Sequence, residues 1–241
     1  MTDALHIHYF AAIREALGRA HDDVPLDELS GTPTVAALWR WLAERYPEAS
    51  AWPGRVRVAV NHSFADEQTT LHPADEIALI PPVSGGSGTE PNAECDVETV
   101  QCEDGLMRVT TMALDPNAVD LMVQRPDAGG VVTFTGRVRD HTGDHDVSYL
   151  VYEAYPEMAL KKLTEVSSAA KQTWPGTRVA IHHRYGRLEI GEAAVVVSVS
   201  HAHRNEAFLA CQFIIDELKR VVPIWKKEVG ATGEEWVGFG P

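Results

Sequence analysis

A glycine pair followed by an acidic stretch divides this chain of 241 residues into two parts. Gly85 and Gly86 end the run IPPVSGG, which directly follows an apolar, strand-like segment. The prolines take this run out of any sheet or helix, and the polar, acidic residues 87–105 are typical of a flexible linker. The sequence therefore predicts a folded unit over residues 1–86, a linker over residues 87–105 and a second folded unit over residues 106–241.

The net charge of −14 is spread unevenly over these parts. Residues 1–86 carry 6 Arg, no Lys and 12 acidic residues, and residues 87–106 carry 6 acidic residues and no basic one. Residues 107–241 carry 15 basic and 17 acidic residues. Nucleic acid is a poor partner for so acidic a chain. The near-balanced charge of the second unit still permits a local basic pocket for a small anionic ligand there.

The cysteines and the hydropathy pattern indicate a cytoplasmic protein. Three cysteines, an odd number without a paired pattern, do not suggest a disulfide framework. No apolar run approaches the 18 residues of a membrane span, and the first residues lack a signal-peptide pattern. Cys211 falls on an apolar helical stripe and Cys95 and Cys102 fall in the linker, so we expect none of them to act as a nucleophile.

Both units mix strand and helix patterns, which predicts an α+β fold. In the first unit we expect strands over residues 5–10, 55–60 and 75–80, and helices over residues 11–17 and from the N-cap Thr34 to Pro47. In the second we expect strands over residues 130–139, 177–185 and 193–200, and helices over residues 116–123, 156–171 and 205–222. The last helix has an apolar stripe of Phe208, Cys211, Ile215, Leu218 and Val222. We also expect Met107 to begin an independent protein, as if two reading frames had been joined.

Five residues of the second unit that carry positive charge or handle protons lie near predicted ends of strands and helices. They are Arg139, His203, Arg204, Lys219 and Lys226. Together they could form a pocket for a phosphorylated small molecule, because loops and helix N-termini at such places favour anions. The alternative is that each is an ordinary solvated charge, which is the usual state of a single Arg or Lys.

The histidines raise the question of a metal site. His201 and His203 form an H-x-H pattern that would place both rings on one face of a strand, whereas His182 and His183 would point to opposite faces. No acidic or cysteine ligand lies at a fitting spacing. We therefore expect structural or substrate-facing histidines and no bound metal.

The motifs around these residues resemble molybdopterin synthase. Residues 5–86 resemble its small, β-grasp subunit through FAAIREALG, VAVN and IPPVSGG. Residues 107–241 resemble its large subunit through GVVTFTGRVR, SHAHR, the pair Leu218-Lys219 and PIWKKE. The resemblance implies a ubiquitin-like β-grasp domain and an α/β hammerhead-type large-subunit domain joined by the linker.

The resemblance also implies a sulfurtransferase that uses no cofactor and acts in molybdenum cofactor biosynthesis. A ubiquitin-activating-type adenylyltransferase would activate the carboxylate of Gly86, and a sulfur donor would convert it to a thiocarboxylate. Two sulfur transfers would then turn cyclic pyranopterin monophosphate into the dithiolene of molybdopterin. Lys219 and Lys226 would be catalytic, and members of the family pair as a homodimer through the large subunit. The substrate would be bound by Arg139, His203, Arg204 and Phe134.

Two departures from the family pattern bear on activity. The chain ends GFGP, where relatives often continue with basic residues that would contact substrate. Gly86 is bonded to Ser87, so its carboxyl group cannot be adenylated unless a protease cuts after Gly85-Gly86. The linker composition favours such cleavage. The alternatives are a carrier fused to a docking scaffold, or an uncleaved form that is inactive or autoinhibited, and the tail could act in its own chain or in another.

Overall fold

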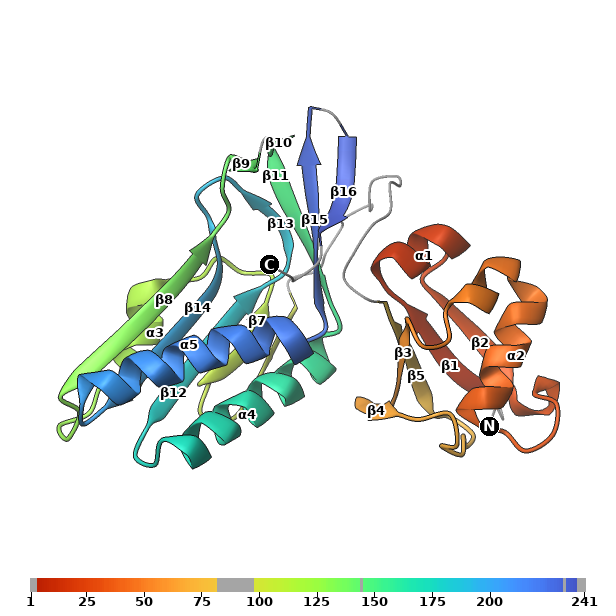
Figure 1. Ribbon diagram of the computed structural model, residues 1–241, viewed down its shortest axis with the longest axis horizontal. Helices are drawn as coiled ribbons and strands as arrows, with labels where there is room; N and C mark the ends of the chain where they lie inside the picture. The colour runs from red at the N-terminus through yellow and green to blue at the C-terminus, as the bar shows by residue number, and fades with distance from the viewer. Residues whose placement is uncertain (1–3, 82–97, 144, 232, 238–241) are drawn as a thin grey trace. The chain divides into compact units, whose positions relative to one another are not determined.

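The computed structural model describes residues 4–81, 98–143, 145–231 and 233–237 (Figure 1). The chain divides into two compact units, Met1–Thr89 and Glu90–Pro241, each with its own apolar core. Gly85, Gly86 and Ser87 lie outside the described residues, as do Cys95 and residues 238–241. Among the described residues, no helix combines the length and the apolar character that crossing a membrane requires.

The first unit is a β-grasp domain. Its five-stranded sheet has the order β2-β1-β5-β3-β4, in which β1 and β5 run parallel and the other neighbours antiparallel. The elements are β1 (Ala4–Tyr9), α1 (Ala11–Leu17), β2 (His21–Pro25), η1 (Leu26–Glu28), α2 (Val35–Arg45), η2 (Pro47–Ala51), β3 (Arg57–Val60), β4 (Ser63–Ala65) and β5 (Glu76–Ile80). The last strand, β5, is the central strand of the sheet and ends directly before the Pro-Pro-Val-Ser-Gly-Gly run.

The predicted elements of this unit are confirmed, and their ends have local causes. Gly18 ends α1 with a φ of 63°, a left-handed conformation that glycine adopts without strain. The Thr34 side chain accepts a hydrogen bond of 3.3 Å from the Ala37 N–H and so caps α2. Strands β2 and β4 were not predicted, because both are short and β2 (HDDVP) is largely polar.

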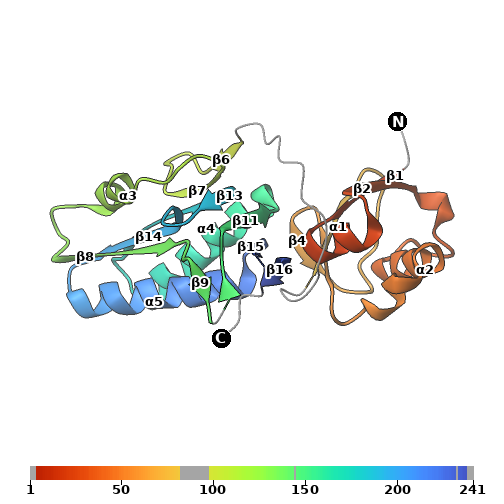
Figure 2. The same cartoon turned by 90° about the horizontal axis from the view of Figure 1, so that it is seen from above.

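The second unit is built on two main sheets. The larger has the order β6-β7-β12-β14-β8 and the smaller β13-β11-β15-β16, and β9 pairs with β10. Helix α3 covers one face of the larger sheet, and α4 and α5 cover the other (Figure 2). The elements are β6 (Thr99–Gln101), β7 (Met107–Thr110), α3 (Pro116–Val123), β8 (Gly130–Arg137), β9 (His141–Thr142), β10 (His145–Asp146), β11 (Tyr149–Ala154), α4 (Pro156–Thr173), β12 (Arg178–Arg184), β13 (Gly186–Glu189), β14 (Ala193–His201), α5 (Arg204–Val221), β15 (Ile224–Gly230) and β16 (Gly233–Val237).

The predicted linker boundary is wrong at its C-terminal end. Residues 98–105 belong to the second unit, because β6 pairs antiparallel with β7 and Val100 packs against the core. The Tyr185 hydroxyl also donates a hydrogen bond of 3.0 Å to the Glu98 carboxylate. The unit therefore begins before Met107. The acidic composition concealed a three-residue edge strand whose pairing is decided by its neighbour.

The predicted apolar stripe of α5 is confirmed for Cys211, Ile215, Leu218 and Val222, which are buried or pack against the core, and is wrong for Phe208. Phe208 is 62% exposed, whereas the side chains that face the sheet are Ala207, Ala210, Cys211, Ile214 and Leu218. Alanines bring the helix close to β14, and the large phenylalanine then has no room beneath it. Cys211 lies in the core as expected, and burial raises its pKa to about 11.

Candidate active site

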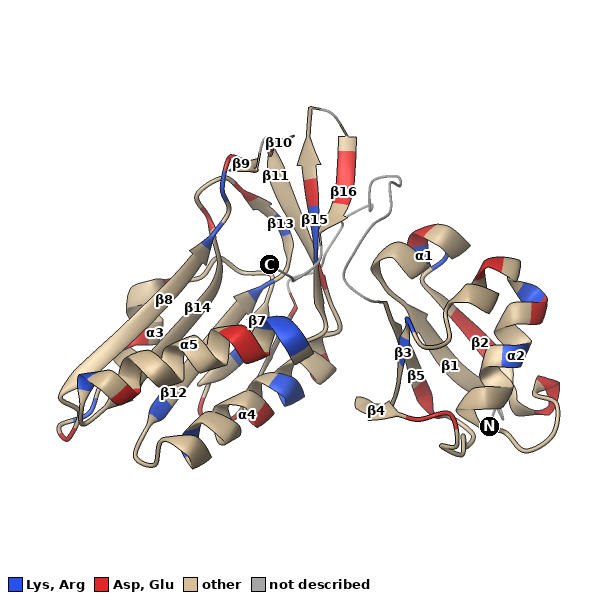
Figure 3. Ribbon diagram, in the orientation of Figure 1, with Lys and Arg blue, Asp and Glu red and all other residues tan. Residues whose placement is uncertain are grey.

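A cavity of about 900 Å³ opens between the two sheets and the C-terminal part of α5. It is lined by β8, β14 and β12 of the larger sheet, by β11 and β15 of the smaller sheet, and by α5. The lining residues are Phe134, Thr135, Gly136, Arg137, Arg139, Tyr152, His183, Ala194, Val195, Val197, Ile215, Asp216, Leu218, Lys219, Arg220 and Lys226. Basic residues mark the end of β8, the last turns of α5 and β15 (Figure 3).

Four of the residues singled out in the sequence meet in this cavity. Phe134 comes from β8, Arg139 from the loop after it, Lys219 from α5 and Lys226 from β15. The strand that carries Lys226 was not predicted, yet it pairs along its length with β11 and so places the lysine beside Tyr152. Residues more than 80 positions apart in the chain therefore line the same cavity.

His203 and Arg204 do not line this cavity. His203 caps the N-terminus of α5 and Arg204 begins the helix, whereas Lys219 lies near its other end. Fifteen residues of α-helix separate Arg204 from Lys219 by about 22 Å. The expectation that all five residues form one pocket is therefore not met within a single chain, because the straight helix between them keeps its two ends apart.

The two lysines differ in their surroundings. The Lys226 Nζ lies 2.8 Å from the Glu228 Oε1, and the Thr142 hydroxyl donates a hydrogen bond of 2.9 Å to the same oxygen. Lys226 is thus paired with a carboxylate. Lys219 is exposed and, like Arg139, has no hydrogen-bond or ion-pair partner within the part of the chain that the structure describes. Those two cations are available to a ligand.

The deepest lining residues are uncharged. His183 is 2% exposed, its Nδ1 lies 2.9 Å from the backbone oxygen of Arg184, and burial lowers its pKa to about 4. Tyr152 meets the His183 ring edge-on, with ring centroids 5.6 Å apart. Burial, and then the charge of Glu228, raise the pKa of Tyr152 to about 12. Both side chains are neutral at physiological pH.

Phe134 is held over the β8 backbone by a glycine. A Cβ added to Gly136 would lie 3.3 Å from the Phe134 Cε1 and 2.7 Å from the Val195 Cγ1. The second distance is shorter than real Cβ contacts allow, so any larger residue would push on both neighbours. Gly136 thereby lets the 38%-exposed Phe134 ring lie along the strand at the cavity wall.

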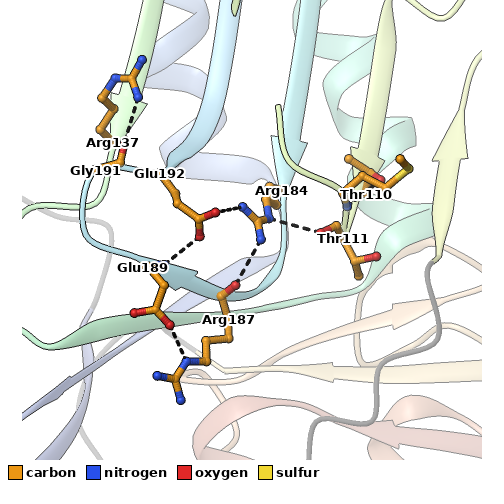
Figure 4. A network of polar contacts seen from close by, with 9 residues as sticks. Thr110, Thr111, Arg137, Arg184, Arg187, Glu189, Gly191 and Glu192 are labelled. Carbon is orange, nitrogen blue, oxygen red and sulfur yellow. Dashed lines mark hydrogen bonds and ion pairs between the residues drawn. The ribbon is translucent and has the colours of Figure 1, made fainter. Parts of the chain in front are cut away.

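A polar network supports the wall beside His183 (Figure 4). The Arg184 guanidinium donates to the Thr111 backbone oxygen at 3.1 Å and to the Glu192 carboxylate at 2.9 Å. The Glu192 carboxylate also accepts from the Glu189 N–H at 2.8 Å, and Arg137 donates to the Gly191 oxygen at 2.7 Å. The network ties the end of β12 to the β13–β14 turn and so fixes the cavity side of both strands.

The histidines outside the cavity have structural partners. The His201 Nδ1 accepts from the His203 N–H at 3.1 Å, and its Nε2 lies 3.2 Å from the Pro175 backbone oxygen. The His182 Nε2 lies 2.9 Å from the Gly105 oxygen. Within the described ranges, no group of three or more His, Cys, Asp or Glu side chains is arranged to hold a metal ion.

Comparison with known proteins matches each unit to a family. Residues 7–86 match the ThiS family, and residues 109–221 match the family described as MoaE protein. The chain is 48% identical over 134 residues to molybdopterin synthase catalytic subunit 1 of Mycobacterium tuberculosis, covering 56% of this chain and 91% of that protein. The chain belongs to the molybdopterin synthase catalytic-subunit family. The ThiS match adds a ubiquitin-like β-grasp unit, so the resemblance seen in the motifs is confirmed for both parts.

Further relatives agree. The molybdopterin synthase catalytic subunit of Pyrococcus abyssi is 45% identical over 116 residues, covering 48% of this chain and 78% of that protein. The crystal structure of molybdopterin synthase from Staphylococcus aureus aligns with a TM-score of 0.54 at 38% identity, covering 55% of this chain and 97% of that chain. The chain is therefore a sulfur-transferring enzyme of molybdopterin biosynthesis.

Sequence reasoning missed several residues of the cavity, notably Arg137, Tyr152, His183 and Arg220. Arg137 stands in the quoted GVVTFTGRVR motif, so its signal was present. Tyr152 lies in YLVYEA, whose alternation of large apolar residues is a strand signal. His183 was expected to be structural or substrate-facing without a place in a pocket, and its cavity position depends on β12 pairing between β7 and β14.

Proposed function

We propose that this chain is a molybdopterin synthase that carries its own sulfur carrier. Gly86, as a thiocarboxylate, would deliver sulfur to cyclic pyranopterin monophosphate in the cavity of the second unit. The observation that carries the proposal is the convergence of Phe134, Arg139, Lys219 and Lys226 on one cavity in a chain with a ThiS-family unit. Two rounds would convert the substrate into the dithiolene of molybdopterin.

The reaction is a net exchange of sulfur for oxygen between carrier and substrate. The thiocarboxylate sulfur attacks an electrophilic carbon of the substrate, which forms a C–S bond and joins the substrate to Gly86 through an acyl–sulfur link. Water then cleaves that link, which returns a carboxylate to Gly86 and leaves sulfur on the substrate. The substrate oxygen departs as water, so each round consumes one thiocarboxylate and no cysteine is required.

The lining cations suit the charges of this reaction. Lys219 and Arg139, which have no partner among the described residues, are available for the substrate phosphate and for anionic intermediates. Lys226, which donates a hydrogen bond to Glu228, is suited to giving a proton to a developing alkoxide or to stabilising it. Phe134 would pack against the incoming glycine tail.

Activity would require cleavage after Gly86 and three helper proteins. A protease frees the Gly85-Gly86 terminus from Ser87, an adenylyltransferase of the ubiquitin-activating type activates it, and a sulfur donor supplies the sulfur. The test is intact mass spectrometry of a preparation that forms molybdopterin. We expect a fragment ending at Gly86. A preparation that is active while holding full-length chain alone would overturn the cleavage step.

A homodimer would bring His203 and Arg204 to the site. β8 is an edge strand of the larger sheet, and its Val131 and Phe134 side chains are each 38% exposed. A two-fold axis that brings two β8 edges together runs them in opposite directions, so the His203 end of one copy would lie beside the Arg139 end of the other. Mixing Arg204→Ala with Lys219→Ala chains should then restore activity in mixed dimers, and no recovery would contradict this arrangement.

The competing possibilities make different predictions. If the second unit were a docking scaffold, Lys219→Ala and Lys226→Ala would leave sulfur transfer unchanged. If the uncleaved chain were autoinhibited, cutting the purified chain after Gly86 with an inserted protease site would raise activity without any other change. Loss of activity in both lysine variants of an already cleaved chain supports the synthase.

A further inference from the structure

We propose that His183, together with Tyr152, recognises the pterin ring of the substrate at the buried end of the cavity. This assignment rests on the proposed function, because it names the part of that substrate which each end of the cavity binds. His183 would accept a hydrogen bond through Nε2, and Tyr152 would supply a neutral aromatic surface beside it. The phosphate would then lie at the open end.

The tautomer of His183 follows from its contact with the Arg184 backbone oxygen. A backbone carbonyl oxygen can only accept, so the contact of 2.9 Å to the Arg184 oxygen requires that the His183 Nδ1 carries the hydrogen. Because the ring is neutral at physiological pH, the Nε2 has a lone pair and no hydrogen. His183 lines the cavity, and its Nε2 is able to accept a hydrogen bond.

The cavity is polarised from one end to the other. Its exposed lining residues include the cations Arg137, Arg139, Lys219 and Arg220, together with Asp216. Its buried lining residues are His183 with the apolar Ala194, Val197 and Leu218, and the partly buried Tyr152 stands against the His183 ring, with Lys226 as its cross-strand partner. A ligand with an anionic end and an uncharged planar end would be oriented by this gradient, with its anion outward.

A pterin ring has hydrogen-bond donors and aromatic faces that the residues at the buried end of the cavity can bind. Its pyrimidine ring presents amino and ring N–H donors along one edge, and its faces are aromatic. Cations can only donate, so the lysines and arginines of the rim cannot accept from that edge. A neutral imidazole acceptor and a tyrosine ring can bind the edge and the face respectively. Discrimination follows, because a ring without the N–H donor would leave the buried His183 Nε2 unpaired.

The test measures ligand binding to the full-length chain and does not depend on cleavage. Titrations use cyclic pyranopterin monophosphate, a reduced pterin without phosphate, and inorganic phosphate. His183→Asn keeps a donor near the Nδ1 position but removes the Nε2 acceptor, and His183→Gln places an amide near Nε2. The matched control is His182→Gln, on the same strand but bonded to Gly105 and outside the cavity lining.

His183→Asn should weaken both pterins by about tenfold and leave phosphate binding unchanged, since one hydrogen bond is lost. His183→Gln should recover part of the affinity, and His182→Gln should match the unaltered chain. Equal pterin affinity in His183→Asn and the unaltered chain would overturn this inference alone. Failure of the unaltered chain to bind cyclic pyranopterin monophosphate would instead overturn the proposed function.

A measurement on the unaltered chain covers the case in which His183→Asn does not fold. The ¹⁵N resonance of the His183 Nε2 reports whether that nitrogen accepts a hydrogen bond. Addition of the phosphate-free pterin should shift it toward the hydrogen-bonded range, whereas phosphate alone should not. An Nε2 resonance that stays in place at saturating pterin would contradict the proposal.

Discussion

The Asp22 cluster of the first unit and the cavity of the second differ in whether all their polar groups have partners among the described residues. In the first, the Asp22 carboxylate accepts hydrogen bonds from Tyr9 at 3.0 Å, Tyr46 at 2.7 Å and Arg19 at 2.8 Å. In the second, the cavity holds exposed cations and a neutral histidine whose Nε2 has no hydrogen-bond partner among the described residues. A closed network stabilises a fold, whereas an open one leaves its groups to a ligand. The difference is in keeping with the proposal that the chemistry takes place in the second unit.

The pKa directions in the Asp22 cluster agree with a structural role. Burial acts to raise the pKa of Asp22, but the hydrogen bonds from Tyr46, Arg19 and Tyr9 outweigh it and lower the pKa overall. Burial, with the charge of Asp22, holds the pKa of Tyr9 well above its usual range. Each group is fixed in one protonation state at neutral pH, so the first unit offers a rigid support for its tail.

The largest effect expected is loss of sulfur transfer on removal of either cavity lysine. Lys219→Ala and Lys226→Ala should each lower kcat by about 10²–10³-fold, the usual cost of losing one group that stabilises transition-state charge. The measurement is molybdopterin formation by the cleaved chain. Lys162→Ala on α4, whose ammonium pairs with Glu165, is the matched control and should leave kcat unchanged. If Lys162→Ala lowered kcat by a comparable factor, the loss in the cavity variants could not be assigned to the cavity.

Breaking the closed network should destabilise the first unit and spare the cavity. Asp22→Ala leaves the hydroxyls of Tyr9, which is 1% exposed, and Tyr46 without their acceptor, at a cost of about 2–4 kcal/mol. Amide hydrogen exchange should quicken in β1 and β5 but not in β12 and β14. Because the pKa of Asp22 is lowered by folding, its stabilisation is present at neutral pH and is lost in acid. Unchanged exchange in β1 would contradict the structural role.

The buried histidine should make the second unit alone sensitive to mild acid. The ordinary imidazole pKa is 6.5, and burial lowers that of His183 to about 4, so between these values the unfolded chain binds the proton and the folded chain does not. Stability should therefore fall with falling pH, by up to about 1.4 kcal/mol per pH unit. We expect the free energy of unfolding of the unaltered chain to drop about 2 kcal/mol more than that of His183→Asn between pH 6.5 and pH 5. Equal slopes would show that His183 titrates normally.

The smallest effect expected comes from the glycine beneath Phe134. Gly136→Ala should destabilise the second unit by about 1–3 kcal/mol, because the added methyl meets Val195 and Phe134. It should also displace the Phe134 ring and raise the KM for the carrier tail more than it lowers kcat. The control is Thr135→Ser, at the adjacent cavity position, because it adds no atom and so no new contact. Gly143→Ala is unsuitable, because Gly143 has a φ of 59° and alanine would be strained there. If Gly136→Ala left the KM for the carrier tail unchanged, the proposed packing of Phe134 against the tail would be contradicted.

Sequence reasoning reached most of the fold where periodicity was strong. The long helices and the apolar strands β8, β12 and β14 were predicted within a few residues. It failed for β6, hidden in an acidic stretch, and for β11 and β15, although Pro156 follows β11 and Pro223 precedes β15. The cavity residues that it found, such as Lys226, came from motifs, and those that it missed, such as Tyr152, became visible only through strand pairing.

The sequence alone determined that two units are joined by a segment that follows a Gly-Gly pair. It also determined that the first unit has no lysine and that each unit belongs to a recognisable family. These properties are local or compositional, so they can be read along the chain. Tertiary structure alone decided which cations share a cavity, because pairing β15 with β11 and packing α5 across the sheet bring Lys226 and Lys219 together. It also separated Arg204 from them, since a continuous helix has a fixed rise per residue and holds its two ends apart.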